Sequence, residues 1–454
     1  MTFDLVVRGG HVYGPGDWGV VDVGIRDGRV VVLGQLGAAS AGQVVDAHGL
    51  VVLPGRVDPH THIAMALAGG TATCDDFFTG TVAAARGGIT TLSDFVEPRP
   101  GQSLAEALGE RVAQARDVAV IDYTFSMTLA SADAATLGEL PSLVEQGVRS
   151  FKMYTINPGL MLDDRSLLVC LKAIARTGAL ATVHAESAAM VAELTEGAGT
   201  GSGGVACFPQ TRPPVAEAEA VGRVLALARL AGAGLCVRHL SSAEGLAVVR
   251  AARRGPPVWV ETAPHYLSLD ESVYRRADGH RFLVTPPLRR REDREALWRG
   301  LGERSVHFLG TDHCALSAVQ KDSPPDGAGV PAGLPGLETC LPLVYTLGVR
   351  SGRISLARLA EITSTAAARA LGWFPRKGTL LPGADADLVL MDAAVVKAVA
   401  EGPGGLGWSP YEGWRLAGWP RLVVSRGEII VAEGEFCARA GRGRYLGPSP
   451  QEWA

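Results

Sequence analysis

Two histidines separated by one residue, His60 and His62, begin the set of residues in this chain whose types and spacing suggest chemistry. In a β-strand, residues i and i+2 project from the same face, so both imidazoles can present a ring nitrogen to one metal ion. A pair of this kind also occurs as two solvated polar residues in a turn. The metal interpretation therefore depends on whether further ligands follow in the chain.

Further candidate ligands stand in apolar runs of strand length, at or near their ends. They are Lys152 in the run 148–154, His184 at the end of 180–184, His239 at the end of 235–239, and Asp312 at the end of 306–312. Alternation along the strand places Lys152 and Tyr154 on one face, so both side chains are expected to point into the same site.

Apolar runs alternate with amphipathic stretches through the centre of the chain. The predicted strands are 50–58, 89–95, 118–125, 148–154, 180–184, 235–239, 258–262 and 306–312, and helix candidates between them include 104–115, 165–177, 215–231, 243–253 and 291–301. Eight β/α units in succession predict an α/β fold with a closed parallel, TIM-like (β/α)8 barrel. Catalytic groups of such barrels lie at the carboxyl ends of the strands.

The two ends of the chain share a sequence pattern that differs from that of the centre. Short strands are predicted at 5–8, 20–26, 30–33 and 44–52, and again at 386–391, 421–425 and 428–431, with Asp27-Gly28 and Arg426-Gly427 as turns. We therefore expect both termini to build one small β-sandwich domain. The predicted divisions are 1–54 and 376–438 for the sandwich, 55–375 for the barrel, and 439–454 for a glycine- and arginine-rich tail, for which an ordered segment and a segment that orders only against another subunit are both open.

Composition narrows the class of partner. The chain has 454 residues, 47% of them hydrophobic, and a net charge of −4 without a basic stripe for nucleic acid or a membrane surface. No stretch is long and apolar enough for a membrane span. The seven cysteines form no C-x-x-C pair, which favours reduced thiols in a cytoplasmic protein. Small molecules are the expected partners.

Four histidines, one lysine and one aspartate are too many ligands for a single zinc ion. They suit two metals about 3.5 to 4 Å apart with a hydroxide between them. A charged ammonium would repel both cations, so Lys152 makes sense as a neutral amine that reacts with carbon dioxide. The resulting carbamate would bridge the metals as a carboxylate does.

Segments on both sides of these residues resemble the cyclic amidohydrolases over most of the chain, from about residue 3 to about residue 436. They are 54–62, 75–81, 150–154, 183–186, 285–289, 310–314 and 378–387. Asp75-Asp76-Phe77-Phe78-Thr79-Gly80-Thr81, the Phe-Lys-x-Tyr step at 151–154, Pro410-Tyr411-Glu412-Gly413 and Gly418-Trp419-Pro420 resemble the dihydropyrimidinase/hydantoinase branch most.

The resemblance implies a role for each candidate. His60 and His62 would bind one metal, His184 and His239 the other, and carbamylated Lys152 would bridge them, with zinc as the expected ion. Asp312 would be both ligand and acid/base, and Tyr154 would donate to the developing oxyanion. The implied reaction opens dihydropyrimidines or 5-substituted hydantoins to N-carbamoyl amino acids. The implied assembly is a homotetramer.

Two positions depart from the usual pattern of this branch. Thr285 stands where serine is usual, and Ala332 stands where asparagine is usual. The resemblance implies that the backbone at these two positions binds the imide of the substrate. The gate loops at 63–70 and 155–162 are also unlike the common versions. Leu67, Ile156, Leu160 and Met161 predict an apolar gate for the ring substituent, with core packing as the alternative for each.

Other readings stay open or are disfavoured. His313 is expected to face away from the site, His265 is a candidate for contact with the pocket, and Glu186 is expected to hydrogen-bond near the metal ligands. A dihydroorotase would need arginine where Ala64 stands. Allantoinase remains an alternative because residues 261–267 and 239–241 have its character, whereas a metal-free scaffolding relative would lack the six ligands.

Overall fold

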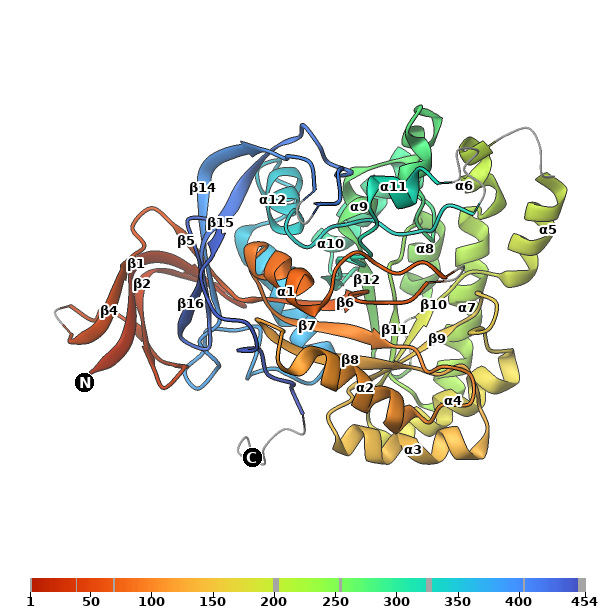
Figure 1. Ribbon diagram of the computed structural model, residues 1–454, viewed down its shortest axis with the longest axis horizontal. Coiled ribbons are helices and arrows are strands. Elements are labelled where there is room, and N and C mark those ends of the chain that lie inside the picture. The colour runs from red at the N-terminus through yellow and green to blue at the C-terminus, as the bar shows by residue number, and fades with distance from the viewer. Residues whose placement is uncertain are drawn as a thin grey trace.

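The protein contains a barrel and a separate sheet. The computed structural model describes residues 2–37, 39–67, 70–198, 204–252, 255–323, 329–402 and 405–447. In Figure 1, the strands from the two ends of the chain, red and blue, lie together on one side, and the barrel occupies the other side. The predicted TIM-like (β/α)8 fold is confirmed.

The barrel sheet consists of eight parallel strands in sequential order. Their bounds are β6 Arg56–Thr61, β7 Ile89–Val96, β8 Asp122–Thr128, β9 Ser150–Tyr154, β10 Leu180–His184, β11 Leu235–Val237, β12 Val258–Thr262 and β13 Phe308–Leu309. A parallel bridge between Thr61 and His313 joins the last strand segment to the first. This bridge brings the first histidine pair and Asp312 to the same place at the mouth.

The first predicted strand, 50–58, was wrong as a single element. It divides into β5 (Val51–Pro54), which pairs with the small sheet, and β6, which begins the barrel. The chain changes sheets at Gly55, where a Cβ would lie 2.2 Å from Thr90 Oγ1 and 2.8 Å from Asp387 Cβ. Only glycine allows the two sheets to approach this closely.

The third strand starts later than predicted, at Asp122 instead of Val118. The apolar residues before it are buried, but their backbone bonds go elsewhere: Gly443 N–H donates to Ala119 O at 2.9 Å and Arg442 donates to Val120 O at 3.0 Å. Apolar runs do not distinguish a strand from a buried loop that pairs with a distant segment.

Helices cover the outside of the barrel (Figure 1). They are α1 Phe77–Arg86, α2 Leu104–Arg116, α3 Ala134–Glu145, α4 Asp164–Thr177, α5 Ala188–Ala198, α6 Phe208–Thr211, α7 Pro214–Ala231, α8 Ala243–Ala251, α9 Pro264–Ser268, α10 Arg291–Gly302, α11 Ala318–Lys321, α12 Cys340–Val344, α13 Leu356–Ala360 and α14 Ala366–Ala370. α4 shows why they form: Asp163 caps its start by accepting from Ser166 N–H at 2.7 Å, and Gly178 ends it in the left-handed region.

The small sheet joins strands from both termini in the order β17-β16-β15-β14-β5-β1-β2-β3, with β4 beside β1. Their bounds are β1 Phe3–Tyr13, β2 Asp17–Arg26, β3 Arg29–Gly34, β4 Ala41–Asp46, β14 Leu388–Ala398, β15 Arg415–Ser425, β16 Glu428–Ala432 and β17 Glu435–Phe436. The predicted strand 44–52 is in fact two, β4 and β5. Asp27-Gly28 and Arg426-Gly427 both have positive φ and turn the chain as predicted. The domain boundaries themselves stay a prediction.

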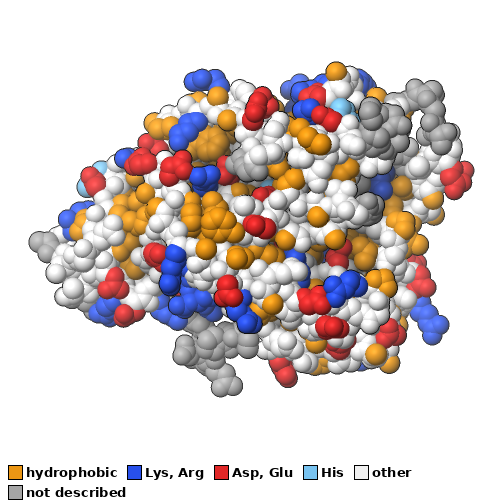
Figure 2. All heavy atoms as spheres, in the orientation of Figure 1, with side chains coloured by type: hydrophobic (Ala, Val, Ile, Leu, Met, Phe, Trp, Pro, Cys, Tyr) orange, Lys and Arg blue, Asp and Glu red, His pale blue; other side chains and the backbone are white. Residues whose placement is uncertain are grey.

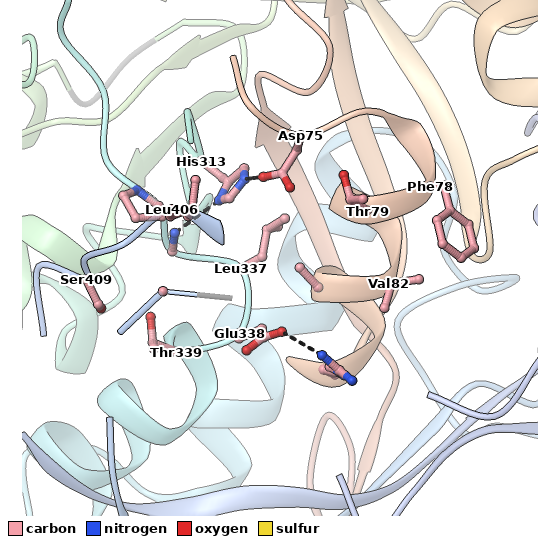
Figure 3. A pocket seen from close by; sticks show the side chains of 15 residues that line it. Asp75, Phe78, Thr79, Val82, His313, Leu337, Glu338, Thr339, Leu406 and Ser409 are labelled. Atoms are coloured by element: carbon pink, nitrogen blue, oxygen red, sulfur yellow. Dashed lines mark hydrogen bonds and ion pairs between the residues drawn. The ribbon is translucent and has the colours of Figure 1, made fainter. Parts of the chain in front are cut away.

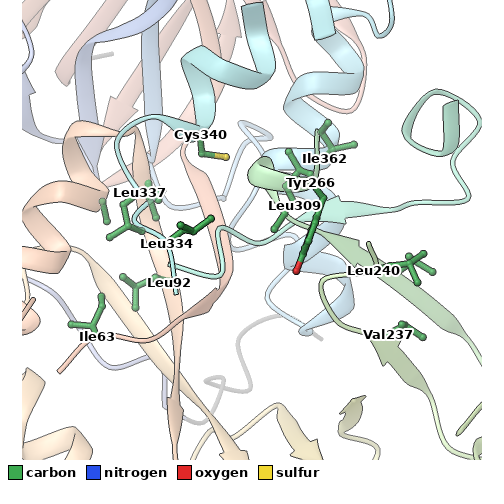
Figure 4. Packing of buried hydrophobic residues seen from close by; sticks show 14 of the residues in the cluster. Ile63, Leu92, Val237, Leu240, Tyr266, Leu309, Leu334, Leu337, Cys340 and Ile362 are labelled. Carbon is green, nitrogen blue, oxygen red and sulfur yellow. The ribbon is translucent and has the colours of Figure 1, made fainter. Parts of the chain in front are cut away.

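Two cores hold these parts together. The barrel core is continuous from strands to helices, and Figure 4 shows part of it, including Leu92, Val237 and Leu309 from three barrel strands. A second cluster, with members such as Val23 and Leu388, draws its residues from both terminal segments. The small sheet therefore buries its own apolar face.

The beginning of the C-terminal tail, whose order the sequence left open, packs against the rest of the chain. Arg442 is buried and donates to Ser425 O at 2.7 Å, while Leu446 N–H donates to Tyr123 O at 2.8 Å. These bonds connect the small sheet to β8 of the barrel. Residues 448–454 lie outside the described part of the chain. No helix in the described part is long and apolar enough to cross a membrane.

Candidate metal centre

One cavity of about 560 Å³ at the barrel mouth collects every residue predicted for the site. Its lining includes His60, His62, Lys152, Tyr154, His184, His239, Thr285, Asp312 and Ala332. These residues come from strand ends and loops more than 250 positions apart in the chain. The barrel topology is what brings them together.

Three of them form a compact group around the Asp312 carboxylate. His60 Nε2 lies 3.0 Å from Asp312 Oδ1, and His62 Nε2 lies 3.2 Å from the same oxygen. One ligand atom from each residue falls within 4.8 Å of the other two. The i, i+2 spacing therefore does place both imidazoles on one target.

The other two histidines form a second group beside the first. His184 Nδ1 and His239 Nε2 are 3.0 Å apart, and the ring centroids of His60 and His239 are separated by 5.5 Å. His239 and Asp312 have φ values of 35° and 51°. Backbone in the left-handed region is strained for residues with a Cβ, and such strain persists where the surroundings impose it, often at active sites.

A buried carboxylate stands behind His60. Glu261 Oε1 accepts from His60 Nδ1 at 2.5 Å, and its other oxygen pairs with Arg238. Burial alone would raise the pKa of Glu261, but Arg238 and His60 outweigh burial and lower it to about 2. Glu261 is therefore an anion that orients the ring. The sequence prediction missed this role, although a polar residue at the end of β12 was the available signal.

His184 has a matching arrangement. Its Nε2 lies 2.8 Å from Glu186 Oε2, which also accepts from Arg212 Nη1 at 2.6 Å. This hydrogen bond confirms the expectation for Glu186. Carboxylates that hold the far nitrogen of a histidine fix its tautomer and leave the near nitrogen as a lone pair.

These donors fit a divalent metal by their chemistry. If His184 donates its proton to Glu186, its Nδ1 offers a lone pair 3.0 Å from His239 Nε2. Burial, followed by the nearby charges of His184 and Lys152, lowers the pKa of His239 well below its ordinary value, so His239 is neutral. In this arrangement either the Nε2–H of neutral His239 donates to His184 Nδ1, or, with the proton on His239 Nδ1, both facing nitrogens present lone pairs that a cation can bind. Nitrogen and carboxylate oxygen ligands are those of zinc and similar ions.

Asp312 carries a negative charge in this surrounding. Burial alone would raise the pKa of Asp312, but His60 and His62 outweigh burial and hold it well below its usual range. Backbone and hydroxyl groups of Thr311 donate to Asp58 at 3.1 and 2.6 Å, which anchors the segment that carries Asp312. These two hydrogen bonds fix the backbone next to Asp312 and therefore the position of its carboxylate.

Lys152 is buried among aromatic rings without an acidic partner. Its Nζ lies 5.0 Å from the centroid of the Tyr154 ring and 5.4 Å from that of Phe95. In the described part of the chain it makes no ion pair. Burial, with the charge of Arg238 adding to it, lowers the pKa of Lys152 to about 7.

Tyr154 has a partner that the sequence did not indicate. Its hydroxyl donates to Glu97 Oε1 at 3.2 Å, and Glu97 follows the end of β7 and lines the same cavity. Burial and the Glu97 charge raise the pKa of Tyr154 well above its ordinary value, so the phenol keeps its proton. The pair could not be found from sequence because it joins the ends of β7 and β9, two barrel strands that are separated by β8.

The predicted gate is only partly formed as expected. Leu67 and Leu160 line the cavity. Ile156 does not: it is buried against Val191 and Ala216, so for this residue the core-packing alternative holds instead of the gate. Met161 is 53% exposed and lies outside the described lining of the cavity.

Two further histidines lie outside the cavity lining. His313 Nε2 pairs with Asp75 at 2.8 Å and its Nδ1 accepts from Gly336 N–H, beside a second cavity of about 200 Å³ (Figure 3). This agrees with the structural role predicted for it. His265 is buried in the first turn of α9, and burial lowers its pKa to about 4. It is not among the described residues that line the site.

The sequence and the structure were compared with those of known proteins. Residues 51–430 match the Amidohydrolase family. The chain is 40% identical over 431 residues to D-phenylhydantoinase of Escherichia coli O1:K1 / APEC, which spans 92% of this chain and 93% of that protein. Among solved structures it superposes on D-hydantoinase from Bacillus sp. AR9 with a TM-score of 0.93, 38% identity, and 97% and 98% coverage. It also superposes on dihydropyrimidinase from Brevibacillus agri NCHU1002 with a TM-score of 0.93 and 38% sequence identity, and the match covers 97% of each chain.

A (β/α)8 barrel whose mouth gathers histidines around a buried carboxylate is an architecture of hydrolases that use metal ions. The chain belongs to the amidohydrolase family.

Proposed function

We propose that this chain is a cyclic amidohydrolase that opens dihydropyrimidines or 5-substituted hydantoins to N-carbamoyl amino acids. The similarity to D-phenylhydantoinase over nearly the whole of both chains carries this conclusion. The gathering of His60, His62 and Asp312 at the cavity gives the similarity a chemical basis. The hydantoinase and dihydropyrimidinase relatives do not favour the allantoinase alternative.

We infer which residues would bind each metal ion. His60, His62 and Asp312 would hold one ion, His184 and His239 a second, and the carbamate of Lys152 would lie between them. Two divalent ions, which we infer to be zinc, would polarise the ring carbonyl and lower the pKa of water. The distances of 3.0 and 3.2 Å from Asp312 Oδ1 to the two imidazoles support the first group.

Lys152 is suited to carry the carbamate. Its Nζ lone pair would form a bond to the carbon of carbon dioxide, and one N–H proton would leave, which turns a neutral amine into an anion. The side chain is 1% exposed and has no carboxylate partner, so nothing nearby holds it as an ammonium. An anion at this position would balance the positive charge of two ions.

Asp312 would move the proton of the reaction. Its carboxylate takes a proton from the attacking water and passes it to the ring nitrogen as the carbon–nitrogen bond breaks. The carbonyl carbon becomes the product's carboxylate, and the freed nitrogen remains in the carbamoyl group. The short contacts to His60 and His62 keep the Asp312 carboxylate ionised, so that it can accept the proton when the water attacks the ring carbonyl.

Tyr154 would stabilise the negative charge that develops on the carbonyl oxygen, an effect worth about 3 kcal/mol in comparable sites. Thr285 and Ala332 line the same cavity, and their backbone groups would hold the imide. Since the contact would come from the backbone, the departures from serine and asparagine are compatible with it.

Assembly and location are part of the proposal. Figure 2 shows hydrophobic side chains gathered where the small sheet meets the barrel. Phe78 of α1 is 37% exposed and packs edge-on against Phe436 of β17, at this junction. An exposed apolar region supports subunit contact, for which we propose a homotetramer. All seven cysteines are unpaired, which supports a cytoplasmic location.

Ring-opening turnover of the zinc-loaded protein tests the function. The panel is dihydrouracil, hydantoin, a hydantoin with a bulky 5-substituent, and allantoin, with the N-carbamoyl product measured by chromatography. We expect dihydrouracil or the hydantoins to be opened faster than allantoin. Opening of allantoin alone would leave the metal centre standing and overturn the substrate assignment, and opening of none would overturn both.

A further inference from the structure

Glu97 is a carboxylate in the substrate cavity without a role in the chemistry derived above. It follows the last residue of β7 (Ile89–Val96) and lines the cavity together with Leu67 and Leu160. Its hydrogen bond in the structure comes from the Tyr154 hydroxyl at 3.2 Å. Among the residues that the structure describes, no lysine or arginine pairs with it.

The charge of the cavity wall is one-sided. Glu97 and Asp312 are the carboxylates of its described lining, and Asp312 is engaged by His60 and His62. The only lysine or arginine in that lining is the deeply buried Lys152. Because Glu97 has no cationic side chain beside it among the described residues, a ligand group that reaches it meets a half-buried carboxylate, and charges interact more strongly there than in water.

The chemistry of the proposed substrate sets what lies near Glu97. In an N-carbamoyl amino acid, the carboxylate carbon is bonded directly to the carbon that carries the side chain. The oxygen of the same carbonyl is the one that Tyr154 would hold, so the ring substituent lies two bonds from the carbon that is attacked. Glu97 contacts the Tyr154 hydroxyl and lines the same cavity as Leu67 and Leu160, so in this binding mode we infer that the substituent can reach it.

Substrate binding also frees Glu97. The Tyr154 hydroxyl has one proton, so it cannot donate to Glu97 and to the developing oxyanion together. When the oxyanion takes that proton, the Glu97 oxygen loses its donor. A half-buried acceptor without a donor is unfavourable, and a donor on the substrate would replace the lost bond.

We propose that Glu97 determines specificity by selecting substrates whose ring substituent carries a hydrogen-bond donor or a positive charge. This inference rests on the proposed function. Leu67 and Leu160 would contact the apolar part of such a substituent, and Glu97 would accept from its polar end. Substituents that end in a carboxylate would be rejected by like charge.

Three 5-substituted hydantoins of matched length test this selection: 3-aminopropyl, butyl and 2-carboxyethyl. We expect wild-type kcat/KM to fall in that order, by roughly tenfold at each step, because one charge interaction at partial burial has about this size. Glu97→Gln should reduce the ratio between the aminopropyl and carboxyethyl substrates to within about tenfold. The ratio cancels any change in the chemistry common to all three.

Glu145→Gln is the matched control, since Glu145 is exposed at the end of α3 and the substitution makes the same change in net charge. It should keep the wild-type ratio. Equal opening of the three hydantoins by the wild type, or an unchanged ratio in Glu97→Gln, would overturn the specificity proposal while leaving the proposed function intact. If the wild type opens dihydrouracil but none of the three hydantoins, only the Glu97 proposal is overturned; if it opens none of the four, the proposed function is wrong as well.

Discussion

The two ends of the barrel each bury a lysine, and they do so in opposite ways. At the mouth, Lys152 lies among rings with no acidic partner. At the other end, Lys377 Nζ lies 2.7 Å from Asp122, 3.0 Å from Asp385 and 2.8 Å from Asp387. Burial lowers the pKa of Lys152 to about 7, whereas the three carboxylates outweigh burial and raise that of Lys377.

The difference teaches how to separate a structural lysine from a reactive one. The chain has five lysines, and three of them, Lys152, Lys321 and Lys377, are buried, although lysine is rarely buried unless it is paired. Lys377 is paired, and its partners come from β8 and from the start of the small sheet's C-terminal half. It joins the barrel to that sheet. Lys152 has no carboxylate partner to stabilise its protonated form. Its amine is therefore more easily neutral, which is the form that can react.

Replacing Lys152 gives the largest expected effect. Lys152→Ala should remove bound metal and lower turnover by about a thousandfold or more, beyond the 10- to 100-fold cost of losing a residue that only supports a ligand. Metal content by atomic emission and ring-opening turnover are measured together, with circular dichroism to check the fold. Lys172→Ala, an exposed lysine on α4, is the control. An active, metal-replete Lys152→Ala protein would contradict the carbamate.

Replacing Lys377 should affect stability instead of chemistry. Lys377→Met removes the cation that three buried carboxylates share. Asp122 and Asp385 keep the partners Arg426 and Arg376, but Asp387 is left without an ion pair among the described residues, which costs about 3 to 5 kcal/mol of unfolding free energy. Urea unfolding measures this loss, while turnover per folded molecule should stay at the wild-type value. Lys397→Met, exposed on β14, should change stability by no more than about 0.5 kcal/mol. Wild-type stability of Lys377→Met would show that the carboxylates do not need the cation.

Lys321 provides a test of the pH dependence, because its hydrogen-bond partners among the described residues are backbone carbonyls. Its Nζ donates to Leu283 O at 3.0 Å and to Pro331 O at 2.8 Å, next to the cavity residues Thr285 and Ala332. Burial lowers its pKa to about 7. The unfolded chain, with an ordinary lysine pKa near 10.4, holds a proton between pH 7 and 10 that the folded state lacks.

The unfolding free energy of the wild type should therefore rise from pH 7 to pH 10. This group contributes up to about 1.4 kcal/mol per pH unit to the rise. Lys321→Met lacks this contribution, so its stability relative to the wild type should decrease steadily from pH 7 to pH 10. Urea unfolding at three pH values measures the trend. Parallel pH profiles of the two proteins would mean that Lys321 stays charged when buried.

Much of the site could be predicted because its signals are local. The alternation of β9 places Lys152 and Tyr154 on one face, and the i, i+2 spacing places His60 and His62 on one target. Element boundaries were less predictable. The run at 118–121 is as apolar as a strand, but its carbonyls are taken by Arg442 and Gly443 from the far end of the chain.

Residues whose roles depend on partners across the barrel were missed for the same reason. Glu261 is an ordinary strand residue until His60 and Arg238 are placed beside it. Ile156 has the character of a gate residue, and only its contact with Val191 shows that it belongs to the core. Periodicity reports which face a side chain is on, not which neighbour it meets.

By itself, the sequence determined the order of eight strands and the chemical groups at their ends, because strand periodicity and residue type are properties of short segments. Only the tertiary structure decided which of these groups are charged and which are held. Burial and through-space partners set the pKa of a lysine, and they differ between Lys152 and Lys377 although both side chains are equally buried. The same holds for Glu97, whose place beside Tyr154 exists only once β7 and β9 stand in one barrel.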